Sequence, residues 1–150
     1  MTTLIECIPN ISEGRRPEVV AAVRNAAVSA GPGVLLLDWT SDADHNRSVL
    51  TFLGDGPALV RAMEAMVAEA LVHVDLTKHE GAHPRLGAVD VIPFVPIRGA
   101  TAADCVVLAK ELGARLAKEH AEVLVVVEYE RLAGVEKNLE KSGAAFEIVS

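Results

Sequence analysis

The apolar residues of this chain follow two different spacings, and the order of these spacings limits the folds that the chain can adopt. Short β-prone runs alternate with segments whose apolar residues recur every three or four positions, which is the spacing of an amphipathic helix. The order is strand, helix, strand, strand, helix, strand, in residues 3–9, 17–30, 34–39, 48–54, 59–71 and 89–97. This order predicts an α+β, ferredoxin-like α/β sandwich, with a mostly antiparallel sheet and helices packed on one face.

The rest of the chain adds further elements to this pattern. Thr101, followed three residues later by Asp104, predicts a capping box at the start of a third helix. Beyond residue 120, the sequence predicts a strand at 123–127, an amphipathic helix near 131–142 and a last strand around 145–149.

Composition narrows the classes of function. A net charge of −7 argues against nucleic acid as a partner, because phosphate binding needs clustered Lys and Arg. We expect no membrane span, since no apolar run approaches the roughly 18 residues required, and we expect a cytoplasmic location because the chain opens without a secretion signal. Cys7 and Cys105 lie in apolar patterns and are predicted to be small buried hydrophobes. Apolar residues make up 51% of the chain, which predicts a surface covered by a partner subunit or a further domain.

Proton-handling and anion-binding side chains concentrate in two polar segments. The first spans residues 41–47 and the second spans 75–87. The residues concerned are Asp42, Asp44, His45, Asn46, Arg47, Lys78, His79, Glu80, His83 and Arg85. A histidine with a pKa of about 6.5 can accept and release a proton at neutral pH, which suits transfer between two nitrogens. From spacing alone, an ordinary solvated surface remains the alternative.

Two stretches resemble metal motifs in letters but not in geometry. Residues 79–83 read His-Glu-Gly-Ala-His, yet the zinc motif needs a helix, which Gly81 weakens and Pro84 opposes. Residues 42–46 resemble the opening of a calcium loop, but Arg47 stands where that loop needs glycine. We therefore expect no metal.

Three stretches, in order and suitably spaced, resemble the N-terminal subdomain of glutamate formimidoyltransferase and of formiminotransferase-cyclodeaminase. They are residues 6–15 (ECIPNISEGR), 44–52 (DHNRSVLTF) and 83–96 (HPRLGAVDVIPFVP). The resemblance covers about residues 4–120. We therefore expect residues 1–120 to form a unit like that subdomain and residues 121–150 to form a strand-helix-strand extension of the same domain.

The resemblance implies a folate-linked transferase. The N5 amine of tetrahydrofolate, the co-substrate, would attack the amidine carbon of N-formimidoyl-glutamate, giving 5-formimidoyl-tetrahydrofolate and glutamate. The histidine of the family's His-Pro-Arg motif is its catalytic acid/base, and His83 holds that position here. Its contribution would be on the order of 10²–10⁴-fold.

Further site residues follow from the matching stretches and the polar loops. Asp42 or Asp44 would assist His83. Substrate- and folate-binding residues are expected at Asn10, Arg15, His45, Asn46, Arg47, Lys78 and Arg85. Arg47 and Arg85 could clamp carboxylates of glutamate and folate in bidentate fashion.

The chain departs from the family's pattern in two ways. Family members often carry Glu before the catalytic histidine, where this chain has Ala82. The family's transferase unit also has a second subdomain beyond the point where this chain ends. The alternatives are therefore a folate-binding or partner-binding module without turnover, or one half of a split transferase with a separately encoded second subdomain. A homo-oligomer is a further possible assembly.

Overall fold

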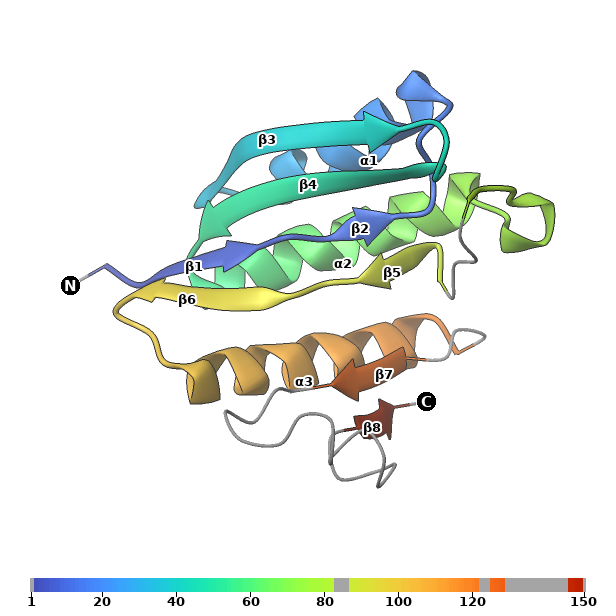
Figure 1. Cartoon of the computed structure of the whole chain (residues 1–150). Coiled ribbons are helices and arrows are strands. Elements are labelled where there is room, and N and C mark those ends of the chain that lie inside the picture. Colours follow the sequence, from blue (N-terminus) through green and yellow to red (C-terminus); the bar gives the residue numbers. More distant parts are fainter. Residues whose placement is uncertain (1, 83–86, 122–124, 129–145, 150) are drawn as a thin grey trace.

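The computed structural model describes residues 2–82, 87–121, 125–128 and 146–149 (Figure 1). Its strands are β1 (Leu4–Cys7), β2 (Asn10–Ile11), β3 (Val34–Asp42), β4 (Arg47–Gly54), β5 (Val89–Val91), β6 (Phe94–Arg98), β7 (Val125–Glu128) and β8 (Phe146–Val149). Its helices are α1 (Pro17–Ser29), α2 (Gly56–His73), α3 (Ala102–Glu119) and the short 3₁₀ helix η1 (Leu76–Lys78).

The main sheet is antiparallel in every described pairing. Its six strands lie along four lines, which are β3, β4, β1 followed by β2, and β5 followed by β6. β3 pairs with β4, β4 pairs with both β1 and β2, and the line of β6 and β5 completes the sheet. The two interrupted lines break at Pro9 and Pro93, which have no N–H to donate to the ladder. Backbone bonds from Ile8 N to Pro93 O (3.1 Å) and from Leu50 N to Pro9 O (3.1 Å) hold the lines together there.

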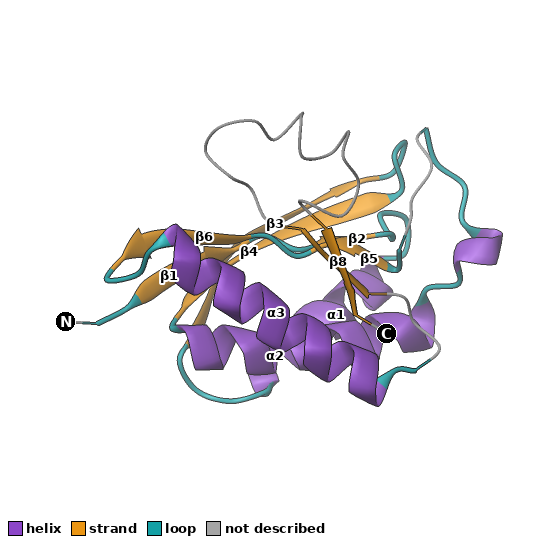
Figure 2. Ribbon diagram, turned by 90° about the horizontal axis from the view of Figure 1, so that it is seen from below, coloured by secondary structure: helices purple, strands orange, loops and turns teal. Residues whose placement is uncertain are grey.

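One face of the sheet is covered by helices, and this face holds the core. In β4, buried residues alternate with half-buried ones, and Leu50 and Phe52 are fully buried. Figure 2 shows the three α-helices on the same side of the sheet. Burial of their apolar faces against the strands is the main stabilising term. The fold is thus the predicted α+β, ferredoxin-like sandwich, with helices packed on one face of an antiparallel sheet.

The structure also refines the predicted elements. Asn10 and Ile11, which lie beyond the strand predicted at 3–9, form β2 because Ile11 is completely buried and pairs with β4 and β5. The run at 89–97 divides into two strands around Pro93. The predicted capping box is confirmed, since Thr101 Oγ1 accepts from Asp104 N (3.2 Å) and Thr101 N donates to Asp104 Oδ2 (2.8 Å).

The tail forms a separate two-stranded sheet. β7 pairs antiparallel with β8, and both lie beside α3 (Figure 1). They correspond to the strands expected at 123–127 and 145–149. The helix predicted at 131–142 lies outside the described residues.

Candidate functional site

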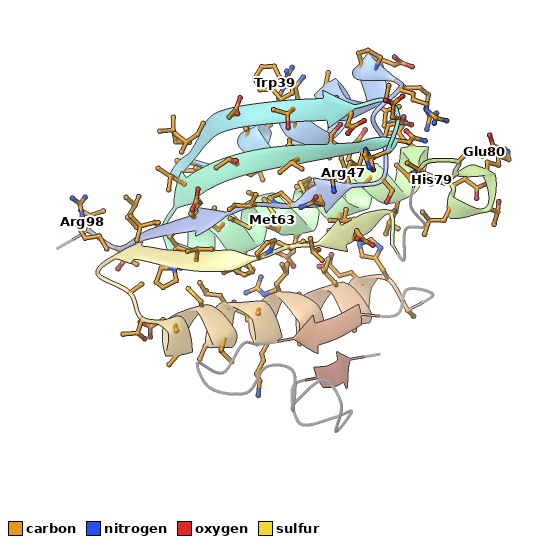
Figure 3. All side chains as sticks on the ribbon, in the orientation of Figure 1. Trp39, Arg47, Met63, His79, Glu80 and Arg98 are labelled. Carbon is orange, nitrogen blue, oxygen red and sulfur yellow. The ribbon has the colours of Figure 1, made fainter. Side chains whose placement is uncertain are left out.

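Three connecting segments meet at one end of the main sheet. They are the loop of residues 12–16 between β2 and α1, the β3–β4 turn, and the segment that follows η1. In Figure 3, Arg47, His79 and Glu80 mark this end of the molecule. The two polar segments that the sequence singles out therefore lie together, although more than 30 residues separate them.

The β3–β4 turn is organised around Asp42. Its carboxylate accepts hydrogen bonds from the backbone N–H groups of Asp44 (2.9 Å) and His45 (3.1 Å). The same carboxylate lies 2.7 Å from His45 Nδ1. The bonds from the backbone and then the side chain of His45 are the main reasons that the pKa of Asp42 is lowered. Within the described residues, Asp42 thus orients His45, and its predicted role beside His83 stays a prediction.

Asn46 joins the turn to both other segments. Its side-chain Oδ1 accepts from Gly14 N (2.8 Å), and its Nδ2 donates to Glu80 O (3.1 Å). Its backbone oxygen lies 3.0 Å from His79 Nε2. Asn46 has a φ of 51° and is only 8% exposed. Both polar ends of this amide bind protein groups.

Glu13 is a buried acid that the motif analysis did not single out. It is 4% exposed, and its carboxylate accepts from Arg15 N (3.0 Å), Arg16 N (3.1 Å) and Arg16 Nε (2.6 Å). Burial raises the pKa of Glu13, but these bonds and the charge of Arg16 outweigh burial and lower the pKa overall. Arg16 Nη2 also donates to His73 O (2.8 Å), which ties the loop to the end of α2. The sequence signal for this ion pair was the spacing of three residues between Glu13 and Arg16.

Two serines, also missed from the sequence, complete the connections. Ser48 is fully buried, and its Oγ donates to Glu13 O at 2.6 Å. Ser12 Oγ donates to Gly87 O (2.6 Å), and Ser12 N donates to Ala88 O (2.9 Å). The loop of residues 12–16 is therefore bonded both to β4 and to residues 87–88, which precede β5.

His83 and Arg85 lie outside the described residues, so their predicted roles stay predictions. The structure does describe the residues on either side of them. Ala82 N donates to Asp44 O (2.9 Å) on one side, and Ser12 holds Gly87 on the other. The described part of the His-Glu-Gly-Ala-His stretch, residues 79–82, is not helical, as the argument against a zinc motif requires.

The remaining predicted binding residues occupy different positions. Arg15 Nε donates to Ala43 O (2.8 Å), so this side chain reaches the β3–β4 turn. Arg47 is the first residue of β4, and Asn10 lies on β2, which pairs with β4. Lys78 lies on η1 with its side chain 84% exposed and its ammonium 3.9 Å from Asp75. Arg15 and Arg47 thus contact the β3–β4 turn, whereas the described side-chain contacts of Asn10 and Lys78 are with Ile8 and Asp75.

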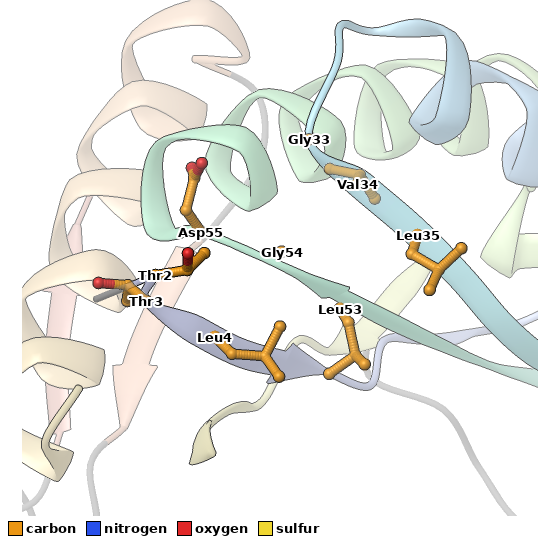
Figure 4. A pocket seen from close by; sticks show the side chains of 9 residues that line it. All are labelled: Thr2, Thr3, Leu4, Gly33, Val34, Leu35, Leu53, Gly54 and Asp55. Atoms are coloured by element: carbon orange, nitrogen blue, oxygen red, sulfur yellow. The ribbon is translucent and has the colours of Figure 1, made fainter. Parts of the chain in front are cut away.

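A shallow cavity of about 420 Å³ lies at the opposite end of the sheet (Figure 4). Its lining includes the apolar side chains of Leu4, Val34, Leu35 and Leu53, together with Asp55. Asp55 serves as the N-cap of α2, since it accepts from Ala58 N at 2.8 Å. The predicted site residues do not line this cavity.

Among the described residues, no α-helix combines the length and the apolar character needed to cross a bilayer. The same residues contain no group of three or more His, Cys, Asp or Glu side chains placed to hold a metal ion.

Fold and site together define an α+β domain of the split β-α-β type, in which three connecting segments are bonded to one another at one end of an antiparallel sheet. Comparison with known families then identifies it. Residues 4–145 match the family described as "Formiminotransferase domain, N-terminal subdomain", and the chain belongs to this family. The match includes residues 121–145, which the motifs alone did not assign. The division of the chain at residue 120 stays a prediction.

Curated relatives support the same family. The chain is 46% identical over 119 residues to a glutamate formimidoyltransferase of Streptococcus pyogenes serotype M1, covering 79% of this chain and 40% of that protein. It is 44% identical over 119 residues to the formimidoyltransferase-cyclodeaminase of Rattus norvegicus, covering 79% of this chain and 22% of that protein. A glutamate formimidoyltransferase of Thermoplasma acidophilum is 44% identical over 117 residues, covering 78% and 38%. The chain thus spans less than half the length of these relatives.

Proposed function

We propose that this chain contributes to a transferase of folate-linked one-carbon metabolism. The reaction moves a formimidoyl group from N-formimidoyl-glutamate to tetrahydrofolate, with His83 as general acid/base. This proposal follows the names of the relatives, two of which are glutamate formimidoyltransferases. A cytoplasmic location is part of the same proposal, because cysteine thiols such as those of this chain stay reduced in that compartment.

One observation carries the proposal: hydrogen bonds join the three motif stretches at one end of the sheet. Gly14 of the first stretch bonds to Asn46 of the second, and Ser48 of the second bonds to Glu13 of the first. Ser12 of the first bonds to Gly87 of the third. The three stretches that carry the resemblance are thus adjacent in space.

The reaction requires a proton to be taken from one nitrogen and a proton to be given to another. A bond forms between N5 of tetrahydrofolate and the amidine carbon, and the bond from that carbon to the glutamate nitrogen breaks. One proton leaves N5 and one reaches the departing amine, and a histidine that titrates near neutral pH suits both steps. Arg47 and Arg15, near the β3–β4 turn, and Arg85 supply cations for the carboxylates of both substrates.

The decisive test is a formimidoyl-transfer assay of the chain with and without His83. We expect His83→Ala to lower turnover by about 10²–10⁴-fold. His73→Ala is the matched control, because this histidine pairs with Glu69 on α2 and takes no part in the proposed reaction. Equal turnover of His83→Ala and the wild type would disprove the role of His83.

A second candidate is a folate-binding module without turnover, or one half of a split transferase. The exposed face of the sheet favours this candidate. Leu35, Val95 and Ile97 are exposed on this side, and a partner subunit, a second copy or a second subdomain would cover them. Folinate binding by calorimetry without turnover would identify the module. Turnover that appears only when a separate second subdomain is added would identify the half enzyme.

A further inference from the structure

Asn46 is placed to connect segments that lie far apart in the sequence. Gly14 is 32 residues before it, and Glu80 is 34 residues after it. One side-chain amide accepts a hydrogen bond from the first and donates one to the second. A buried amide whose donor and acceptor are both satisfied fixes the groups around it, because leaving either group unpaired is costly.

The backbone at Asn46 narrows the choice of residue. A φ of 51° lies in the left-handed region, which asparagine and glycine adopt most readily. Glycine has no side chain to reach Gly14 and Glu80. Aspartate would fit, but its second oxygen would face the oxygen of Glu80 in place of the Nδ2 donor. Asparagine alone supplies the backbone, the acceptor and the donor together.

Residues 79–82, which Asn46 contacts, pack closely against the β3–β4 turn. A Cβ on Gly81 would lie 2.5 Å from the backbone oxygen of His45. The next residue, Ala82, donates its N–H to Asp44 O at 2.9 Å. The bond that Asn46 Nδ2 donates to Glu80 O and the bond that Asn46 O accepts from His79 Nε2 thus help to fix where residues 79–82 lie relative to the turn.

We propose that Asn46 is a positioning residue, which fixes residues 79–82 against the β3–β4 turn and so sets the geometry of the site without contacting substrate. The role in turnover rests on the proposed function, whereas the anchoring of residues 79–82 does not. The two parts can therefore be tested separately.

Two variants and one control make the test. Asn46→Gly keeps the left-handed backbone and removes both side-chain bonds, and Asn46→Asp keeps the shape and the acceptor but removes the donor to Glu80. Asp55→Ala is the control, because it removes the N-cap bond to Ala58 N at the far end of β4 and so destabilises the fold away from the site.

Amide hydrogen exchange of the full chain measures the anchoring. Exchange of the Ala82 N–H should be about tenfold faster in Asn46→Gly and faster also in Asn46→Asp. In Asp55→Ala it should keep the wild-type rate once the loss of global stability is subtracted. An unchanged Ala82 rate in Asn46→Gly would overturn the inference, whether or not the chain catalyses transfer.

Kinetics measure the consequence for the site. In a wild-type chain that turns over, Asn46→Gly should lower kcat by up to about a hundredfold and change KM little, because the reacting groups are displaced while substrate contacts remain. A raised KM with unchanged kcat would show that Asn46 binds substrate and would overturn the positioning role. A wild type that is inactive both alone and with an added second subdomain would refute the proposed function, and the exchange of Ala82 would still decide the anchoring.

Discussion

Replacing Glu13 by glutamine should destabilise the protein at neutral pH. The two carboxylate oxygens accept three hydrogen bonds, two from backbone N–H groups and one from Arg16 Nε. A glutamine has one acceptor oxygen and an NH₂ group, so either the guanidinium or the backbone donors must face another donor. The substitution thus loses at least one charge-assisted bond in a residue that is 4% exposed.

The expected loss follows from the strength of such bonds. A hydrogen bond to a charged group contributes about 1.5–3 kcal/mol. The side chain of Arg16 is 49% exposed, so water solvates the released guanidinium and the loss falls toward the lower end. We expect Glu13→Gln to lower the free energy of unfolding by about 1.5–2 kcal/mol and Tm by about 3–8 °C.

The loss should depend on pH with a definite sign. The pKa of Glu13 is lower in the folded chain than its ordinary value of 4.5, so its charged form stabilises the fold at neutral pH. This contribution is complete above that ordinary value and disappears as the pH falls through the lower folded pKa. The difference in unfolding free energy between wild type and Glu13→Gln should therefore stay constant from neutral pH to about pH 5.5 and shrink below it.

Urea unfolding followed by circular dichroism, repeated over this pH range, measures the difference. Glu119→Gln is the control, since Glu119 is exposed at the end of α3 and its replacement should cost less than about 0.5 kcal/mol. Equal stability of Glu13→Gln and wild type at pH 7 would refute the reasoning. So would a difference that does not change down to the lowest pH at which both chains fold.

Three further predictions rest on single contacts. Gly14→Ala should cost about 1–3 kcal/mol in urea unfolding, because its Cβ would lie 2.6 Å from the backbone N and O of Arg47; an unchanged midpoint would show that the loop can move aside. Burial, then the nearby Cys105, raises the pKa of the Cys7 thiol, so a thiol reagent at pH 8 should label Cys7 only after unfolding; rapid labelling of Cys7 in the native chain, mapped by mass spectrometry, would contradict this. Arg24→Ala should alter the fluorescence of the single tryptophan, Trp39, and cost about 0.5–1 kcal/mol, because Arg24 Cζ lies 4.6 Å from the ring centroid; unchanged emission and acrylamide quenching would indicate no such contact in solution.

Elements whose signals are local could be predicted from the sequence. The spacing of Thr101 and Asp104 is sufficient for a capping box, and the structure contains it. Pro17 at the start of α1 is likewise a signal that neighbouring residues do not change. Strand β2 could not be predicted this way, because Asn10 and Ile11 are extended only through pairing with β4 and β5, which are distant in sequence.

The site shows the same division. Its location was predictable, since the polar residues cluster in two segments that the split β-α-β order brings to one end of the sheet. The function of Asn46 within it was not, because that function depends on a left-handed backbone and on partners more than 30 residues away. Glu13 lies between these cases. Its partner Arg16 is three residues away, but its burial comes from the whole fold.

The proline breaks also leave gaps in the backbone ladder at one level of the sheet. The pairs Cys7 with Phe94 and Asn10 with Val91 place Ile8 opposite Pro93, and Pro9 lies next to it. Ile8 donates to Pro93 O and Leu50 donates to Pro9 O, but neither proline has an N–H to donate in return, so two ladder bonds are missing at adjoining positions. At this level the sheet therefore relies more on side-chain burial than on backbone bonds, and Pro9 is fully buried there.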